Sequence, residues 1–311
     1  MTLIIRDYRD GDAEAVVALL YANAPYRVMT PRGLHAQVVG SPARQHYRLL
    51  VAEDGHGRIG GFVRAAVFAD TKDPGLSFAS LVVAPGDRGA GVGSALLAAA
   101  EDHLAAVGAH TLYTWAFDEP AAHGFAARHG YRRGRSASYL RLDLAPGGPL
   151  PDRADLPSGV QLLPAAHFAD DLPRLHEADQ ECFVGEPGDV TPDAISYQDW
   201  RTTIWDRPDF DQQLSTVAVV DGDIAGLMLV ETDDRGRYWS SGTAVHPAHR
   251  GRGLARAAKA HSLHLARDRG LHEAYTSNDG GNAPMLAVNR WLGYEPCATE
   301  WRYIRDLTDR A

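Results

Sequence analysis

The stretch LVVAPGDRGAGVG at residues 81–93 occurs a second time, as TAVHPAHRGRGLA at residues 243–255. Proline, arginine and glycine recur in register, each pair 162 residues apart: Pro85 with Pro247, Arg88 with Arg250, and Gly91 with Gly253. The same spacing relates Gly108 to Gly270 and Thr114 to Thr276, and a spacing of 163 relates Gly130-Tyr131 to Gly293-Tyr294. Two copies with so long a period indicate a duplicated domain and not a solenoid of short repeats.

The residues around each copy of this stretch predict the same order of elements. An opening strand leads into helical segments, and then a hairpin and a further strand enter the glycine-rich turn. A helix follows the turn and stops at Gly108 or Gly270, because glycine favours helix termination. A strand, a short helix and a closing strand complete each copy. The predicted opening strands are 3–8 and 160–163, the hairpins 49–67 and 215–231, the strands before the turn 78–83 and 239–245, and the closing strands 138–144 and 301–304.

A stretch rich in proline and glycine separates the two copies. It covers residues 145–159, a composition typical of a linker. We therefore predict an N-terminal domain over residues 1–144 and a C-terminal domain over residues 160–311. A length of 311 residues fits two domains, each able to bury its own core.

The glycine-rich turns have the properties of a phosphate site. A turn from strand to helix leaves backbone N–H groups unpaired at the positive end of the helix dipole, and small residues let a diphosphate approach them. Two other phosphate motifs are excluded. No Lys-Ser/Thr pair follows the glycines, as a nucleotide-triphosphate P-loop requires, and Ser94 and Arg256 occupy the third glycine position of a dinucleotide fingerprint.

Charge and composition narrow the class of partner. The net charge of −9 is uneven: residues 1–150 carry 15 basic and 14 acidic side chains, and residues 151–311 carry 16 and 26. An acidic surface repels nucleic acid and anionic membranes, so we expect neither partner. The acidic excess is either a solvated face or a field that attracts a cationic amine.

The sequence shows no targeting signal and no metal-binding motif. No apolar run approaches the roughly 20 residues that a membrane span needs, and the first residues do not resemble a signal peptide. Cys182 and Cys297 form no metal spacing, and His261 and His264 lack a convincing third ligand. We therefore expect a cytoplasmic protein without a metal site, and the sequence does not predict its oligomeric state.

The two copies resemble the GNAT (acyl-CoA N-acyltransferase) superfamily, including its tandem members. The resemblance rests on the Arg-x-x-Gly-x-Gly/Ala pattern of both turns and on the Gly-Tyr pairs near the end of each copy. It implies an α/β (α+β) fold of two fused domains, each a mixed, mostly antiparallel, splayed sheet flanked by helices. It also implies acetyl-CoA, or another acyl-CoA, as co-substrate.

The resemblance implies which residues contact that co-substrate. The diphosphate would lie on the turn, and the pantetheine arm beside the strand that precedes it. The implied contacts are Leu81, Val82, Val83, Arg88, Gly89, Ala90, Gly91, Val92, Gly93 and Ser94 in the first copy, and Thr243, Ala244, Val245, Arg250, Gly251, Arg252, Gly253, Leu254, Ala255, Asn282 and Asn289 in the second.

The second copy is favoured as the catalytic one. Asn282 matches an asparagine that commonly contacts the cofactor arm in this family, and the first copy has none there, although asparagine is also a common helix cap. The tyrosine that often protonates the leaving thiolate is replaced by Ala126 and Asn289. Tyr275 and Tyr294 are alternative donors or plain core residues.

The expected reaction is direct attack of an amine on a thioester carbonyl. An alkylammonium has a pKa of about 10.4, so a general base within hydrogen-bond reach of the amine would help. The candidate bases are Glu231, at the end of the hairpin strand, and Glu186 and Asp189, on the presumed substrate side. Each has an alternative role as a surface residue. Four aromatic residues are candidates for a pocket wall or for the core: Trp200, Trp205, Phe210 and Trp239.

These observations predict an N-acetyltransferase that transfers acetyl from acetyl-CoA to a primary amine of a small molecule. Two alternatives stay open. One is a CoA-binding sensor or scaffold with little turnover, which the missing tyrosine favours. The other is acetylation of a protein N-terminus or lysine.

Overall fold

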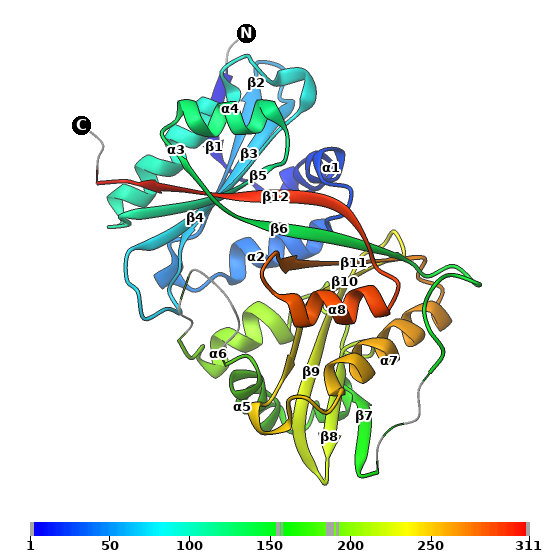
Figure 1. Cartoon of the computed structure of the whole chain (residues 1–311). Coiled ribbons are helices and arrows are strands. Elements are labelled where there is room, and N and C mark those ends of the chain that lie inside the picture. The colour runs from blue at the N-terminus through cyan, green and yellow to red at the C-terminus, as the bar shows by residue number, and fades with distance from the viewer. Residues whose placement is uncertain (1–2, 154–155, 157, 185–189, 191–192, 309–311) are drawn as a thin grey trace. The chain divides into compact units, whose positions relative to one another are not determined.

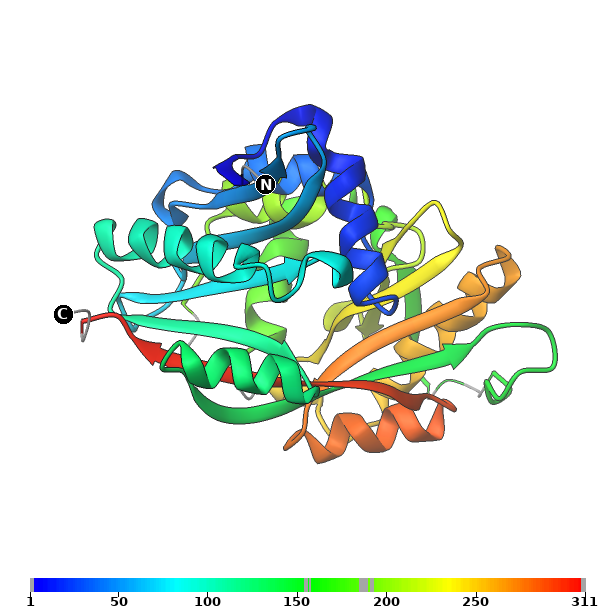
Figure 2. The same cartoon turned by 90° about the horizontal axis from the view of Figure 1, so that it is seen from above.

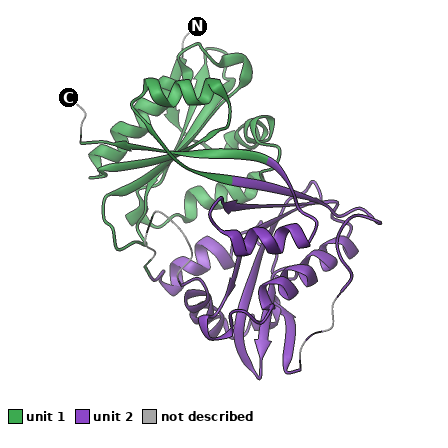
Figure 3. Ribbon diagram, viewed as in Figure 1, with its two compact units in different colours: residues 1–137, 189–193, 298–311 green, residues 138–188, 194–297 purple. Residues whose placement is uncertain are grey.

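A computed structural model describes residues 3–153, 156, 158–184, 190 and 193–308. The chain divides into two compact units, which Figure 3 shows in different colours. Unit 1 comprises Met1–Ala137, Asp189–Asp193 and Ala298–Ala311, and unit 2 comprises Ser138–Gly188 and Ala194–Cys297.

Unit 1 is built on a mixed sheet with strand order β1-β2-β3-β4-β5-β12, in which only β4 and β5 of the neighbouring pairs run parallel (Figure 1). Its elements are β1 (Leu3–Asp7), α1 (Ala13–Asn23), α2 (Pro31–Gly40), β2 (Arg48–Asp54), β3 (Ile59–Val67), β4 (Leu76–Val83), α3 (Val92–Ala106), β5 (Thr111–Phe117) and α4 (Pro120–Arg128), with short 3₁₀ turns at Asp10–Asp12, Ala43–Gln45 and Pro85–Asp87.

Unit 2 repeats this arrangement with strand order β6-β11-β10-β9-β8-β7, and β10 and β11 form its parallel pair. Its elements are β7 (Val160–Pro164), α5 (Leu172–Cys182), α6 (Tyr197–Trp200), a π-helical turn (Arg201–Trp205), β8 (Thr216–Val220), β9 (Asp223–Thr232), β10 (Arg237–Val245), α7 (Leu254–Asp268), β11 (Glu273–Asp279) and α8 (Ala283–Trp291), with 3₁₀ turns at Ala165–Phe168 and Pro247–His249. The predicted fold class is confirmed: two fused domains, each a mixed, mostly antiparallel sheet flanked by helices.

The closing strands β6 (Arg132–Asp143) and β12 (Glu295–Asp306) are each shared between the units. They run side by side in both views (Figure 1 and Figure 2). Leu140 and Leu142 of β6 are buried in the core of unit 2, whereas Tyr303 of β12 is buried in the core of unit 1. The compact units therefore differ from the predicted domains, whose boundaries lie at residues 144 and 160. Apolar side chains of β6, the closing strand of the first copy, are buried in unit 2, and apolar side chains of β12, the closing strand of the second copy, are buried in unit 1.

Each sheet carries helices on both faces, as the alternation of its side chains requires. In unit 1 one face packs against α3 and α4 and the opposite face against α1 and α2. In unit 2 the corresponding layers are α7 with α8, and α5 with α6. In each unit, the sheet, the glycine-rich turn and the helix that follows it (α3 or α7) meet near the end of the parallel strand pair.

The parallel strand pairs separate part of the way along. In unit 1 the pairing of β4 with β5 ends at Ala79 and Thr114, although the strands continue to Val83 and Phe117. In unit 2 the pairing of β10 with β11 ends at Ser240 and Thr276, before the strand ends. Both sheets are therefore splayed next to the glycine-rich turns, as the family resemblance implied.

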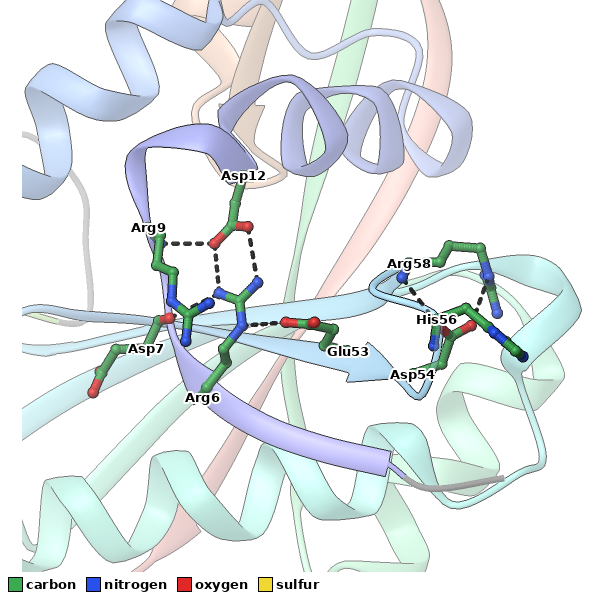
Figure 4. A network of polar contacts seen from close by, with 8 residues as sticks. All are labelled: Arg6, Asp7, Arg9, Asp12, Glu53, Asp54, His56 and Arg58. Carbon is green, nitrogen blue, oxygen red and sulfur yellow. Dashed lines mark hydrogen bonds and ion pairs between the residues drawn. The ribbon is translucent and has the colours of Figure 1, made fainter.

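An ionic network holds the edge strand of unit 1 (Figure 4). Arg6 on β1 donates to both carboxylate oxygens of Asp12, at 2.7 and 2.9 Å, and to Glu53 on β2. The backbone N–H of Arg9 donates to Asp12 at 2.7 Å. Burial raises the pKa of Asp12, but the hydrogen bonds from Arg6 and Arg9 outweigh it, so the net shift of this pKa is downward.

We expect Asp12→Asn to lower the free energy of unfolding at pH 7 by about 1–3 kcal/mol, because it removes hydrogen bonds to a charged group. A carboxylate with a lowered pKa in the folded state stabilises the fold above its unfolded pKa of about 3.9, and this contribution is lost as the pH falls further. The difference between wild type and variant should therefore shrink at pH 3. Urea unfolding followed by circular dichroism measures it. Asp7→Asn, which breaks an exposed pair with Arg48, is the control and should have a smaller effect. Equal stabilities at pH 7 would contradict this account of the network.

Candidate functional site

The glycines of both turns have left-handed backbone conformations. Gly89 and Gly91 have φ angles of 79° and 87°, and Gly251 and Gly253 have φ angles of 77° and 78°. A Cβ atom added at any of these four positions would meet no atom within 4 Å. Glycine is therefore required by the backbone conformation and not by crowding, and the space beside the turns is open.

The helices that follow the turns start without a side-chain cap. The first intrahelical hydrogen bonds run from Ala95 N–H to Gly91 C=O and from Ala257 N–H to Gly253 C=O, both at 3.0 Å. The amides between these partners lie in the first turn of α3 or α7 and have no intrahelical acceptor. These free amides and the exposed glycines together make the kind of helix N-terminus that binds anions in proteins.

The arginines of the turns contact the protein itself. The Nε of Arg250 donates to the carbonyl of Val245 at 2.9 Å, and its Nη2 donates to the carbonyls of Val184 at 2.7 Å and Cys182 at 3.5 Å. The sequence predicted these arginines only as contacts for the cofactor. The structure adds a role for Arg250 in holding the end of β10 against the end of α5.

Arg88 makes the equivalent contacts in the first copy. Its Nε lies 3.5 Å from the carbonyl of Val83, and its Nη2 donates to the side-chain oxygen of Asn23 at 2.6 Å. In both copies the turn arginine thus links the end of the strand to the end of the first long helix.

A β-bulge distinguishes the second copy. The register of β9 with β10 shifts between Ser240 and Gly242, whereas β3 and β4 pair without a shift. The extra residue is Ser241. Before the bulge, equivalent residues of β4 and β10 are 161 apart, as Leu76 and Arg237 are, and after the bulge they are 162 apart. A bulge takes backbone groups out of the ladder and often lies beside an active site.

A pocket of about 230 Å³ opens next to this bulge, with all its lining residues in unit 2. The lining combines aromatic and aliphatic walls with three charged side chains. It consists of Asp179, Phe183, Thr203, Ile204, Arg207, Phe210, Leu229, Glu231, Ser241 and Gly242.

Glu231, one of the predicted bases, lies in this pocket with 22 % of its side chain exposed. Burial raises its pKa to about 7, Arg207 opposes the rise and Asp209 adds to it. Arg207 is committed mainly to Asp209, with two hydrogen bonds of 2.8 and 2.5 Å, and its Nη2 lies 3.9 Å from Glu231. A carboxyl group with this pKa can accept a proton near neutral pH.

The other predicted site residues have different placements. Glu186 and Asp189 lie outside the described residues. Asn282 accepts a hydrogen bond from the N–H of Met285 at 3.2 Å, which is the helix-cap role. Asn289 is 0 % exposed and donates to Asn278, so the structure does not support a direct contact between Asn289 and a cofactor.

The residues predicted beside the cofactor arm alternate in burial, as strand residues must. Val82 and Ala244 are buried, whereas Leu81, Val83, Thr243 and Val245 are partly exposed. The turn residues Arg88–Gly91 and Arg250–Gly253 are exposed, so their backbone is accessible to a ligand.

The aromatic residues separate into wall and core. Trp200 and Trp205 are buried and stack at 6.0 Å, so these two tryptophans are core residues. Trp239 is partly exposed and packs on Tyr139. Of the two roles that the sequence left open for Phe210, the structure supports the pocket wall. Sequence reasoning missed Phe183, Asp179 and Arg207, because no spacing in the sequence reports that the end of α5 reaches the bulge.

The described part of the chain contains neither a candidate metal site nor a candidate membrane-spanning helix. No cluster of three histidine, cysteine or acidic side chains there could hold a metal ion. None of the helices in the same residues is both long and apolar enough to cross a membrane.

Comparisons with known proteins give consistent matches over both copies. Residues 45–133 match the acetyltransferase (GNAT) domain, and residues 172–294 match the acetyltransferase (GNAT) family. The mycothiol acetyltransferase of Nocardia farcinica is 31% identical over 304 residues, which cover 94% of each chain. That of Thermobispora bispora is 29% identical and covers 95% of this chain and 96% of its own.

Solved structures show the same fold. A tandem GNAT protein from the clavulanic acid biosynthesis pathway has a TM-score of 0.74 at 23% identity, and covers 98% of this chain and 99% of its own. A GCN5-related N-acetyltransferase from Sphaerobacter thermophilus has a TM-score of 0.72 at 20% identity, and covers 98% of this chain and 96% of its own.

The contact between Phe183 and Gly242 gives a test of the pocket's geometry. A Cβ atom at Gly242 would lie 2.7 Å from the Cζ atom of Phe183, so Gly242→Ala must displace the ring. We expect a loss of about 1–3 kcal/mol in the free energy of unfolding, as for other overpacked sites. Chemical denaturation measures this loss. Gly86→Ala, where a Cβ atom would meet nothing within 4 Å, should be close to neutral, and the geometry is wrong if both variants behave alike.

Proposed function

Because the chain belongs to the GNAT acetyltransferase family, and is therefore an acyltransferase that uses acetyl-CoA, we propose that its second copy acetylates a primary amine of a small molecule. One observation carries the proposal. The pocket joins Glu231, whose pKa is raised to about 7, to the bulge of β10, the strand that leads into the glycine-rich turn.

The turn fits the diphosphate of the cofactor. The uncapped amides at the start of α7 and the open space beside Gly251 and Gly253 provide donors that a diphosphate can approach. Acetyl-CoA supplies an acyl group activated as a thioester. The backbone of β10 near the bulge would orient its carbonyl and polarise it through N–H groups.

Glu231 would take the proton that the amine must lose. An alkylammonium has a pKa of about 10.4, so at neutral pH only a small fraction is the free amine that can attack. A carboxylate in the pocket shifts this equilibrium locally and relays the proton, directly or through one water molecule. Phe183 and Phe210 add apolar walls to the same pocket.

The charge of the pocket favours a cationic acceptor. Asp179 and Glu231 line it together with Arg207, whose guanidinium is neutralised by Asp209. When Glu231 is ionised, its carboxylate attracts an ammonium group and disfavours an acceptor carboxylate.

The size of the pocket and the names of the relatives point to a small acceptor. A volume of about 230 Å³ suits the amine-bearing end of a small molecule. Because the curated relatives are named mycothiol acetyltransferase, a precursor of mycothiol is the first acceptor to test. The predicted cytoplasmic location belongs to this proposal, and the free thiols of Cys182 and Cys297 are compatible with it.

We propose a supporting role for the first copy. Its strand β4 has no bulge, and Tyr26 and Arg27, in the segment after α1, both hydrogen-bond to Glu300, which is only 3 % exposed. These contacts tie that segment to β12 of the same unit, whereas unit 2 has its pocket beside the end of its first long helix.

Glu231→Gln should lower kcat/KM by about 10²- to 10⁴-fold, because it removes the general base. In the wild type the rate should rise with pH as Glu231 loses its proton near pH 7, and this limb should be absent from the variant. The assay is release of free CoA from acetyl-CoA with an amine acceptor, followed with a thiol-reactive dye. Glu177→Gln, an exposed change on α5, is the control. An unchanged pH profile in Glu231→Gln would remove Glu231 as the base.

Gly253→Ala should weaken binding of CoA to the second copy by about tenfold. A left-handed backbone costs a non-glycine residue roughly 1–2 kcal/mol, so the free turn of the variant should relax to another conformation. CoA must then restore the left-handed turn on binding, and 1.4 kcal/mol is a factor of ten in affinity. Isothermal titration calorimetry with CoA measures the change. Gly91→Ala makes the same change in the first copy, so a loss of binding in that variant alone would place the cofactor in the first copy and contradict the proposal.

A further inference from the structure

The guanidinium of Arg250 holds the backbone on both sides of Phe183. Its Nη2 donates to the carbonyl of Val184 at 2.7 Å and, more weakly, to that of Cys182 at 3.5 Å. Its Nε donates to Val245 at the end of β10. Because the donors of a guanidinium are planar and fixed in direction, this side chain helps to fix where α5 ends relative to β10.

Phe183 is the C-cap residue of α5, and its ring forms a wall of the pocket. The ring lies on Gly242, where an added Cβ atom would come within 2.7 Å of Cζ and 3.0 Å of Cε1. The wall therefore depends on two conditions: a residue without a side chain next to the bulge, and a fixed end of α5. Gly242 meets the first condition and Arg250 meets the second.

The first copy has the same arginine without the wall. Arg88 links the end of β4 to Asn23, the last residue of α1, but the C-cap residue there is Ala24. The counterpart of Gly242 is Ser80, since the two residues pair with Leu229 and Arg64 at equivalent places in the two ladders. The ring of Phe183 and the bare backbone of Gly242 thus occur together in the copy that has the pocket.

We infer that Arg250 is a positioning residue for the acceptor: it fixes the end of α5 so that Phe183 closes the pocket against Gly242. The inference rests on the proposed function in one respect, namely that the pocket receives the amine. It goes beyond that function because it gives the side chain of the turn arginine a task on the acceptor side, while the backbone amides of the turn serve the cofactor.

Loss of the Arg250 side chain should therefore weaken binding of the acceptor more than binding of CoA. Without the guanidinium, the carbonyls of Val184 and Val245 lose their shared donor, and the end of α5 is held less firmly against β10. The ring of Phe183 then leaves Gly242 and the pocket widens. The left-handed glycines and the uncapped start of α7 do not depend on these contacts, so binding of CoA should be largely retained.

The test compares Arg250→Ala, Phe183→Ala and the double variant of the full chain. Benzylamine serves as the acceptor probe, CoA serves as the binding probe, and hydrogen–deuterium exchange reports on the peptide that covers residues 172–184. We expect Arg250→Ala to raise the KM for benzylamine about tenfold or more, because it removes the hydrogen bonds from a charged donor that position the pocket wall. The Kd for CoA should change less than about threefold, a free-energy change under 1 kcal/mol.

Three further results are expected. Exchange of residues 172–184 should become faster in Arg250→Ala. The double variant should have the same KM for benzylamine as Phe183→Ala, because the arginine acts through the ring. Arg250→Lys should recover only part of the loss, since an ammonium cannot reproduce the planar fork. Arg174→Ala, which also removes an arginine from a backbone carbonyl, that of Gly222, is the matched control on α5 and should leave both constants unchanged.

The inference is overturned if Arg250→Ala weakens CoA binding tenfold while exchange of residues 172–184 is unaltered, since the side chain would then serve the cofactor. Additive effects of Arg250→Ala and Phe183→Ala on the KM would overturn it as well. A wild-type chain that binds no CoA would contradict the proposed function instead, and the exchange measurement would still decide whether Arg250 holds the end of α5.

Discussion

The parallel pairing of β10 with β11 stops at Ser240 and Thr276, and the arrangement of the site depends on that separation. Beyond it, β10 carries the bulge at Ser241 and then passes into a turn that only glycine can follow without strain at Gly251 and Gly253. The strand β10 therefore lines the pocket at Ser241 and Gly242, and a few residues later it leads to the unpaired amides at the start of α7. The distance between acyl donor and acceptor would be set by the length of that strand.

The two copies show how one extra residue changes what a common fold can do. Both have the splayed strands, the left-handed turn and an arginine that ties the strand to the first long helix. Only the second copy has the inserted Ser241, and it is there that Phe183 meets Gly242 and Glu231 lies in a pocket. The first copy instead uses Glu300, contributed by β12, to hold the segment after α1. This contrast is a physical reason for assigning chemistry to one copy and support to the other.

The sequence predicted the duplicated fold and the turns well, because their signals are local. Glycine at Gly91 and Gly253 reports a left-handed backbone directly, and alternating apolar residues report strands. The bulge was not predicted, because the recognisable repeat begins at residues 81 and 243, after the inserted Ser241, and its constant spacing of 162 shows no trace of the insertion. Phe183 was missed for a different reason: its role depends on where α5 ends, which is a tertiary property. The exchange of closing strands was missed because Leu140 and Tyr303 look like ordinary strand residues, whichever core receives them.

If the proposal is right, the turn at residues 250–255 holds acetyl-CoA beside the pocket that contains Glu231. A crystal structure of the full chain with CoA bound tests this placement. We expect the diphosphate on the amides of this turn, with the thiol end directed towards Ser241. Density for CoA only at the turn of residues 88–93, or at neither turn, would contradict it.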